Sequence, residues 1–168
     1  MHGKSMKLAN EALKVFVHSL PLGSKFNIYS FGTLFTKVFV ESEVYTDESF
    51  KKAMEEISQF AANMGGTEIL ISIQDIFQKQ VDPRLPRHLY LLTDGAVANT
   101  KEIVSEIKKN VQSCRVHTFG IGEGASSELI KNCAFAGHGH YSFISDPEEL
   151  VKKVMLALQK DFLEYLEI

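Results

Sequence analysis

The first stretch of the chain shows the apolar pattern of a helix. From Lys4 to Leu20, apolar side chains return to one face of a helix, which predicts an amphipathic helix with one buried side. These positions are Leu8, Ala12, Leu13, Phe16 and Leu20. Pro21 and Gly23 then end the helix, because both residues are helix-stop signals. Since the pattern begins so near the first residue, we expect no strand before it, and five strands in the whole chain.

Two β-rich segments and two helical patterns come next. The segments 26–31 and 37–40 are joined through Gly32 and Thr33, which predicts a hairpin. Gly65 and Gly66 separate the helical patterns that follow. Their apolar positions are Phe50, Ala53, Met54, Ile57, Phe60 and Ala61 in the first, and Ile69, Leu70, Ile73, Ile76 and Phe77 in the second.

The second half of the chain alternates short strands with helices. His88 to Thr93 is an apolar run that ends at the turn signal Asp94-Gly95, as is typical of a strand buried on both faces. Strands at 115–121 and 141–144 follow, with helices near 103–111, 129–133 and 150–162. Because parallel strands need crossover connections, this order predicts an α/β fold with a doubly wound, mostly parallel sheet. No linker divides the chain, so we expect one domain over residues 1–168.

Composition narrows the class of function. The chain has 168 residues, and 45% of them are hydrophobic, enough to bury the core of one domain. Eighteen Lys and Arg against 21 Asp and Glu give a formal charge of −3 without a block of like charges, so the basic surface of a nucleic-acid binder is absent. Cys114 and Cys133 lack the spacing of a zinc or redox motif, and we expect both to be buried thiols.

Targeting signals are also missing. No apolar stretch has the length of a membrane span, and Met1 to Asn10 has no signal-peptide core, so we expect no membrane association. The sequence contains no Asn-x-Ser/Thr glycosylation acceptor, which favours a cytoplasmic location.

Two polar residues stand where chemistry is expected. Ligands of open α/β sheets bind at the carboxyl ends of strands, which makes Asp94 a candidate, with Gly95 allowing the chain to turn. In Met64-Gly65-Gly66-Thr67-Glu68, two glycines precede a threonine that starts a helix. Both residues have a structural alternative, since Asp and Thr commonly cap turns and helices. Together, however, they are an oxygen pair of the kind that binds Mg²⁺ when few protein groups and several waters hold the ion.

Four segments resemble, in order, the signature segments of von Willebrand factor type A domains. They are Phe26-Asn27-Ile28-Tyr29-Ser30-Phe31-Gly32, Gly65-Gly66-Thr67-Glu68-Ile69-Leu70, Leu92-Thr93-Asp94-Gly95 and Phe119-Gly120-Ile121-Gly122. Each segment is short, but four in this order and spacing are specific, and the resemblance covers essentially the whole chain. The chain is most similar to the branch in which this module follows a vault-type inter-alpha-trypsin (VIT) domain, as in von Willebrand factor A domain-containing protein 5A and the inter-alpha-trypsin inhibitor heavy chains.

The resemblance implies a Rossmann-like fold, a protein-interaction function and a metal ion-dependent adhesion site. In this family three loops build the site: an Asp-x-Ser-x-Ser after the first strand, a Thr in a second loop and an Asp after the fourth strand. The bound Mg²⁺ is presented to a carboxylate of a partner protein. Thr67 and Asp94 match the second and third loops, and Gly65, Gly66 and Gly95 shape them.

The chain departs from the family pattern at its beginning. The family's Asp-x-Ser-Gly-Ser-Met stands directly before the first helix, and here Met1-His2-Gly3-Lys4 begins where that Met would lie. The first strand, one carboxylate and both serines are therefore missing, so segment 26–31 and strand 88–93 lose their shared neighbour. Each unpaired buried backbone group costs about 1–3 kcal/mol, against a total stability of roughly 5–15 kcal/mol. We expect weak or absent Mg²⁺ binding, since one carboxylate and one hydroxyl form a poor cage.

Three other motifs favour different functions less strongly. Gly120-x-Gly122-x-Gly124 has its third glycine at the wrong offset for a dinucleotide loop. His138 and His140 have no third metal ligand at a recognisable spacing, and Gly137 and Gly139 instead predict a turn. The serines that could act as nucleophiles lack a Gly-x-Ser-x-Gly elbow; they are Ser30, Ser126 and Ser127. We therefore expect an interaction module rather than an enzyme. The alternatives are a nucleotide-binding or hydrolytic enzyme of doubly wound type, and a non-autonomous fragment of a larger protein.

Overall fold

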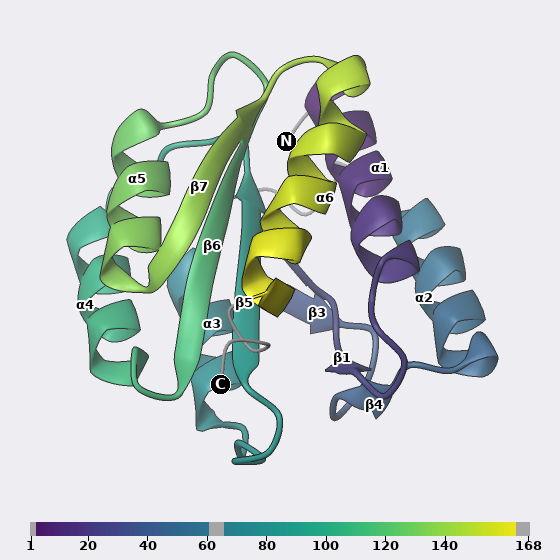
Figure 1. Ribbon diagram of the computed structural model, residues 1–168. Helices are drawn as coiled ribbons and strands as arrows, with labels where there is room; N and C mark the ends of the chain where they lie inside the picture. The colour runs from purple at the N-terminus through teal and green to yellow at the C-terminus, as the bar shows by residue number, and fades with distance from the viewer. Residues whose placement is uncertain (1–2, 61–65, 164–168) are drawn as a thin grey trace.

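The computed structural model describes residues 3–60 and 66–163, the last two by their backbone only. A central sheet separates two layers of helices (Figure 1). One layer contains α1 (Lys4–His18) and α6 (Pro147–Leu163), with α2 (Asp47–Gln59) packed against the outer side of α1. The other layer contains α3 (Ile69–Gln78), α4 (Thr100–Asn110) and α5 (Ser127–Ala136). The prediction of an α/β, doubly wound, Rossmann-like fold is confirmed, and no strand precedes α1 in the described residues.

None of the helices in the described part of the chain is both long enough and apolar enough to cross a bilayer.

The central sheet consists of three parallel strands in the order β5-β6-β7. These are β5 (Arg87–Thr93), β6 (Cys114–Ile121) and β7 (His138–Ile144). Leu92 packs in the cluster formed by α1 and α6, whereas its neighbour Leu91 packs in the cluster formed by α3, α4 and α5. Both faces of β5 are therefore covered, which is why its sequence is a continuous apolar run rather than an alternating one.

The hairpin region is more divided than predicted. β2 (Tyr29–Phe31) pairs with β3 (Phe35–Lys37), and β1 (Lys25–Phe26) pairs with β4 (Glu43–Val44), both antiparallel. The described residues thus form seven strands, so the prediction of five is wrong. The prediction of one strand spanning 26–31 is also wrong, as is that of a strand at 37–40, because β3 ends at Lys37.

The side chain of Asn27 explains the break. Its Oδ1 accepts hydrogen bonds from the backbone N–H groups of Ile28 at 2.8 Å and Phe39 at 3.0 Å. Its Nδ2 donates to the carbonyl oxygen of Phe39 at 2.8 Å. A side-chain amide therefore makes bonds that ladder groups would otherwise make, and it divides the predicted strand into β1 and β2.

Within the described residues, the hairpin strands pair with one another and not with the strands of the central sheet. β2 and β5 belong to separate sheets, and a cavity of about 1400 Å³ is lined by residues of α1, α3, β2 and β5. The hairpins are held instead by a third apolar cluster, which joins Phe26 and Phe39 to Val17 of α1 and Ile57 of α2. This separation of β2 from β5 is the arrangement expected when no strand lies between them.

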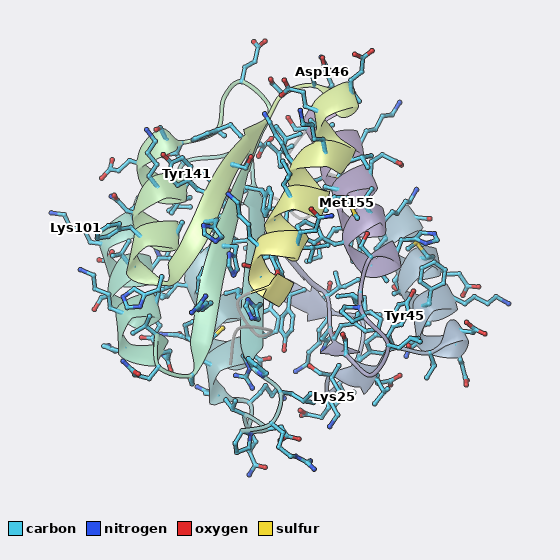
Figure 2. The ribbon with its side chains drawn as sticks, viewed as in Figure 1. Lys25, Tyr45, Lys101, Tyr141, Asp146 and Met155 are labelled. Atoms are coloured by element: carbon cyan, nitrogen blue, oxygen red, sulfur yellow. The ribbon has the colours of Figure 1, made fainter. Side chains whose placement is uncertain are left out.

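The prediction of a turn around Gly137 and Gly139 is wrong, because β7 begins at His138. Both His138 and His140 lie within the strand, and the register changes from Val116↔His138 to Thr118↔Tyr141. β7 therefore contains one extra residue, a β-bulge. After the bulge, Tyr141 lies on the α5 side of the strand (Figure 2), where Lys131 of α5 sits over its ring.

Gly139 is required at this bulge because the two strands approach closely. A Cβ atom on Gly139 would lie 2.1 Å from the carbonyl oxygen of Val116. We therefore predict that Gly139→Ala lowers the free energy of unfolding by about 1–3 kcal/mol, the usual cost of overpacking. Urea unfolding measures this. Gly124→Ala is the matched control, since its Cβ would meet its nearest neighbour, the Asp94 carbonyl oxygen, only at 3.9 Å. Equal midpoints for the two variants would contradict the packing argument.

We also predict that the isolated chain self-associates. In the described residues, β2 and β5 each have a ladder partner on one side only, and such edges pair readily with other chains. Analytical ultracentrifugation over a range of concentrations should show a monomer that converts to larger species. A single monomeric boundary at all concentrations would mean that the edges are closed in solution.

Candidate functional site

The two predicted site residues lie side by side at the carboxyl end of β5. Asp94 follows this strand directly, and Thr67 lies in the loop before α3. A Cβ atom on Gly95 would stand 3.8 Å from the Oγ1 of Thr67, so the threonine hydroxyl touches the Asp94-Gly95 turn. Thr67 and Asp94 are half-buried, and both line the 1400 Å³ cavity.

The hairpin turn holds the Thr67 loop in place. The backbone N–H of Glu68 donates to the carbonyl oxygen of Gly32 at 2.8 Å. Gly66 has a φ of +52°, and a Cβ atom there would lie 3.1 Å from the backbone nitrogen of Thr33. Gly66 therefore shapes the loop as a residue with positive φ, whereas Gly95 does not have positive φ. Gly65 lies outside the described residues.

Neither residue caps the helix that follows it. The N-cap position of α3 is Glu68, and that of α4 is Asn99; neither helix has a side-chain cap bond in the part of the chain that the structure describes. The helix-capping alternatives for Thr67 and Asp94 are therefore not what the geometry shows. Both residues line the same cavity, and their hydroxyl and carboxylate oxygens are of the type that a hard cation binds.

The first turn of α1 reaches the same end of the sheet. A Cβ atom on Gly122, which follows β6, would lie 2.9 Å from the hydroxyl oxygen of Ser5. The carboxyl ends of β5 and β6 thus carry hydroxyl groups from Ser5 and Thr67 and one carboxylate from Asp94. Mg²⁺ prefers six oxygens in near-octahedral geometry and keeps several waters when the protein supplies few. These residues suit a hard cation but are too few to replace most of its water shell.

The structure also shows a polar cluster that the sequence analysis missed. His88, His117 and Asp161 come together where α6 packs on the sheet, and His138 is not one of the three. The sequence carries one signal of it, because His88 begins the apolar run of β5 and His117 lies in the mostly buried strand β6. By spacing in the chain, only the pair His138 and His140 stands out as candidate histidine ligands.

Comparison with known proteins establishes the family. A family model described as von Willebrand factor type A domain matches residues 1–143. A von Willebrand factor A domain-containing protein of Dictyostelium discoideum is 40% identical over 155 residues, which are 92% of this chain and 17% of that protein. Von Willebrand factor A domain-containing protein 5A of Rattus norvegicus is 38% identical over 154 residues, 92% of this chain and 19% of that protein. The chain therefore belongs to the von Willebrand factor type A domain family, and it spans less than a fifth of these relatives.

Solved structures show the same fold. A von Willebrand factor type A protein from Catenulispora acidiphila matches with a TM-score of 0.76 and 25% identity, over 90% of this chain and 37% of that one. Proximal thread matrix protein 1 from the mussel byssus, with a zinc-occupied MIDAS motif, has a TM-score of 0.70 and 18% identity. The match covers 92% of this chain and 42% of that one. Manganese-loaded TRAP protein of Plasmodium vivax has a TM-score of 0.61 and 18% identity, over 87% of this chain and 64% of that one.

The loop glycines give a direct test of the site geometry. We predict that Gly66→Ala destabilises the protein by about 1–2 kcal/mol, since a side chain is disfavoured at positive φ. Gly95→Ala should change the free energy of unfolding by less than about 0.5 kcal/mol, because its Cβ makes only an ordinary contact with Thr67. Thermal unfolding of the pair checks this. A larger loss for Gly95→Ala would mean that the Asp94 turn is tighter than described.

Proposed function

We propose that this chain is a protein-interaction module that binds its partner through a divalent cation held by Thr67 and Asp94. The observation that supports the proposal is that Thr67 lies beside the Asp94-Gly95 turn and lines the same cavity as Asp94, and neither residue caps the following helix. A cation between them would leave a coordination position for a carboxylate of the partner. Gly66 and Gly95 shape the two loops.

Metal-bound relatives support this class of ligand. Proximal thread matrix protein 1 is described with a zinc-occupied MIDAS motif and TRAP with manganese, and both share the fold of this chain. We propose Mg²⁺ here because Thr67 and Asp94 offer only oxygen ligands, which suit a hard cation.

Among the described residues, Thr67 and Asp94 alone would form an incomplete cage. One carboxylate neutralises only part of the ion's charge, so the ion should keep most of its water shell and bind weakly. A strand between β2 and β5, parallel to β5, would end beside Asp94, because the carboxyl ends of parallel strands lie at one edge of a sheet. Such a strand ending in Asp-x-Ser-x-Ser would add the missing carboxylate and hydroxyls.

The enzyme alternative has less support. A Cβ atom on Gly120 would meet the ring of Phe143 at 2.6 Å, so this glycine is needed for packing. The hydroxyl of Ser126 accepts from the backbone N–H of Leu129 and caps α5. Gly120 and Ser126 therefore have structural roles, and neither a nucleotide-binding loop nor a nucleophile is needed to explain these residues. A rise in melting temperature on adding ATP would instead favour the enzyme.

The metal test uses an extended chain. We predict that adding a first strand ending in Asp-x-Ser-x-Ser produces Mg²⁺-dependent stabilisation, because an ion that binds only the folded state stabilises it by RT ln(1 + [L]/Kd). At ten times Kd this amounts to about 1.4 kcal/mol. Differential scanning calorimetry with and without millimolar Mg²⁺ measures the shift.

Three controls separate the strand from the metal. The same extension with alanine at its Asp and both Ser positions should stabilise the fold without a response to Mg²⁺. Asp94→Ala and Thr67→Ala should weaken the response of the extended chain, and the unextended chain should show little. No response in the extended chain would remove the adhesion-site proposal. A clear response of the unextended chain, abolished by Asp94→Ala, would show that its own residues suffice.

A further inference from the structure

Three potential metal ligands converge between α6 and the central sheet. They are His88 of β5, His117 of β6 and Asp161 of α6. The side chains of His117 and Asp161 are each 1% exposed. His88 Nδ1 lies 3.1 Å from His117 Nε2, which in turn lies 3.5 Å from Asp161 Oδ1. One ligand atom from each residue lies within 4.8 Å of the others.

These separations match those around a small tetrahedral ion. With bonds of about 2.0–2.2 Å to histidine nitrogen and carboxylate oxygen, neighbouring ligand atoms around zinc stand about 3.3–3.5 Å apart. The observed distances of 3.1 Å and 3.5 Å fall at or near this range. A modest movement of His88 or Asp161 would bring the third pair to the same separation.

The protonation of the cluster also suits a metal. Burial lowers the pKa of His88, and burial together with His88 and His140 lowers the pKa of His117 to about 3. Both rings are therefore neutral near pH 7, which is the form that ligates metals. Since His117 carries no charge, its contact with Asp161 is not an ion pair. Burial also raises the pKa of Asp161, because a buried carboxylate loses the solvation of its charged form.

The Asp161 carboxylate is held by one oxygen only. Its Oδ2 accepts a hydrogen bond of 2.5 Å from the hydroxyl of Tyr90, whereas Oδ1 has no hydrogen-bond partner in the described part of the chain. A buried polar atom without a partner is costly. The Tyr90 bond also orients the carboxylate toward His117, as an outer-shell partner of a metal ligand does.

We propose that His88, His117 and Asp161 form a binding site for a transition-metal ion of the zinc class. Two imidazole nitrogens and one carboxylate oxygen are a ligand set that Zn²⁺ uses with a fourth, open position. His88 and Tyr90 also line the 1400 Å³ cavity, which provides a path for the ion. The site is separate from the oxygen site at Thr67 and Asp94, and it does not rest on the proposed function.

Ion binding has a specific consequence for His117. The bulge in β7 directs the backbone N–H of His140 to the Nδ1 of His117 at 3.1 Å, so the neutral ring carries its proton on Nε2. To bind a metal, Nε2 must release this proton and Nδ1 must take one up. The bond from His140 is then lost, and its backbone amide must find another acceptor. Loading of the site should therefore be visible at the bulge as well as at the metal.

The experiment titrates the full chain with Zn²⁺ and, separately, with Co²⁺. We expect one equivalent of Zn²⁺ to raise the melting temperature, and we expect a chelator to reverse this rise. Co²⁺ should give visible absorption bands of a four-coordinate site, since geometry is diagnostic for this ion. In NMR spectra, Zn²⁺ should shift the His140 backbone amide more than amides far from the cluster.

Two variants and a control decide the assignment. Asp161→Asn keeps the shape of the side chain, and His88→Phe keeps a ring beside Tyr90 while removing the nitrogen; each should weaken Zn²⁺ binding at least about tenfold. His138→Asn removes an exposed histidine of the same sheet and should bind Zn²⁺ like the original chain. Circular dichroism without metal checks that each variant folds. No response in the original chain, or an undiminished response in a folded variant, would overturn the site.

Discussion

The parallel pairing of β5 with β6 is the interaction on which the rest of the structure depends. Its register runs from Arg87↔Cys114 to Thr93↔Gly120 without interruption. This alignment places the turn after β5 and the turn after β6 at one edge of the sheet, where the first turn of α1 and the loop before α3 also arrive. The same register sets Tyr90 opposite His117 on the α6 face. A slip by one residue would turn one strand over and would separate both groups of polar side chains.

The pattern of apolar residues along the chain predicted those elements whose burial depends on their own sequence. β5 was recognisable because both of its faces are covered, and the helices were recognisable because each buries one face. The hairpin was not, because the break at Asn27 depends on bonds to Phe39, twelve positions away in the chain. Nothing in the alternation of residues 26–31 shows that a side-chain amide will replace the strand pairing.

The two groups of polar residues, Thr67 with Asp94 and His88 with His117 and Asp161, differ in how far the sequence predicts them. The sequence pointed to Asp94 because it follows a buried strand, and to Thr67 because it follows two glycines before a helix. The position of Thr67 beside the Asp94-Gly95 turn depends on how the hairpin turn holds Gly66. His88, His117 and Asp161 come from three elements and meet only when α6 docks on the sheet. Each of them, taken alone, is compatible with an ordinary buried polar residue. The closely spaced histidines 138 and 140 were easier to notice, but spacing in the chain is a poor guide to which side chains meet in the fold.

The bulge in β7 also sets which way the end of that strand faces. Before it, His138 stands opposite Val116; after it, Ile144 stands opposite Ile121 and joins the apolar cluster under α1 and α6. Side chains of a strand alternate between faces, so one residue more or fewer exchanges the two sets. Without the extra residue, Tyr141 would point toward α6 and Ile144 toward α5. The one extra residue thus sets which side chains in the last part of β7 face the α1 and α6 layer and which face α5.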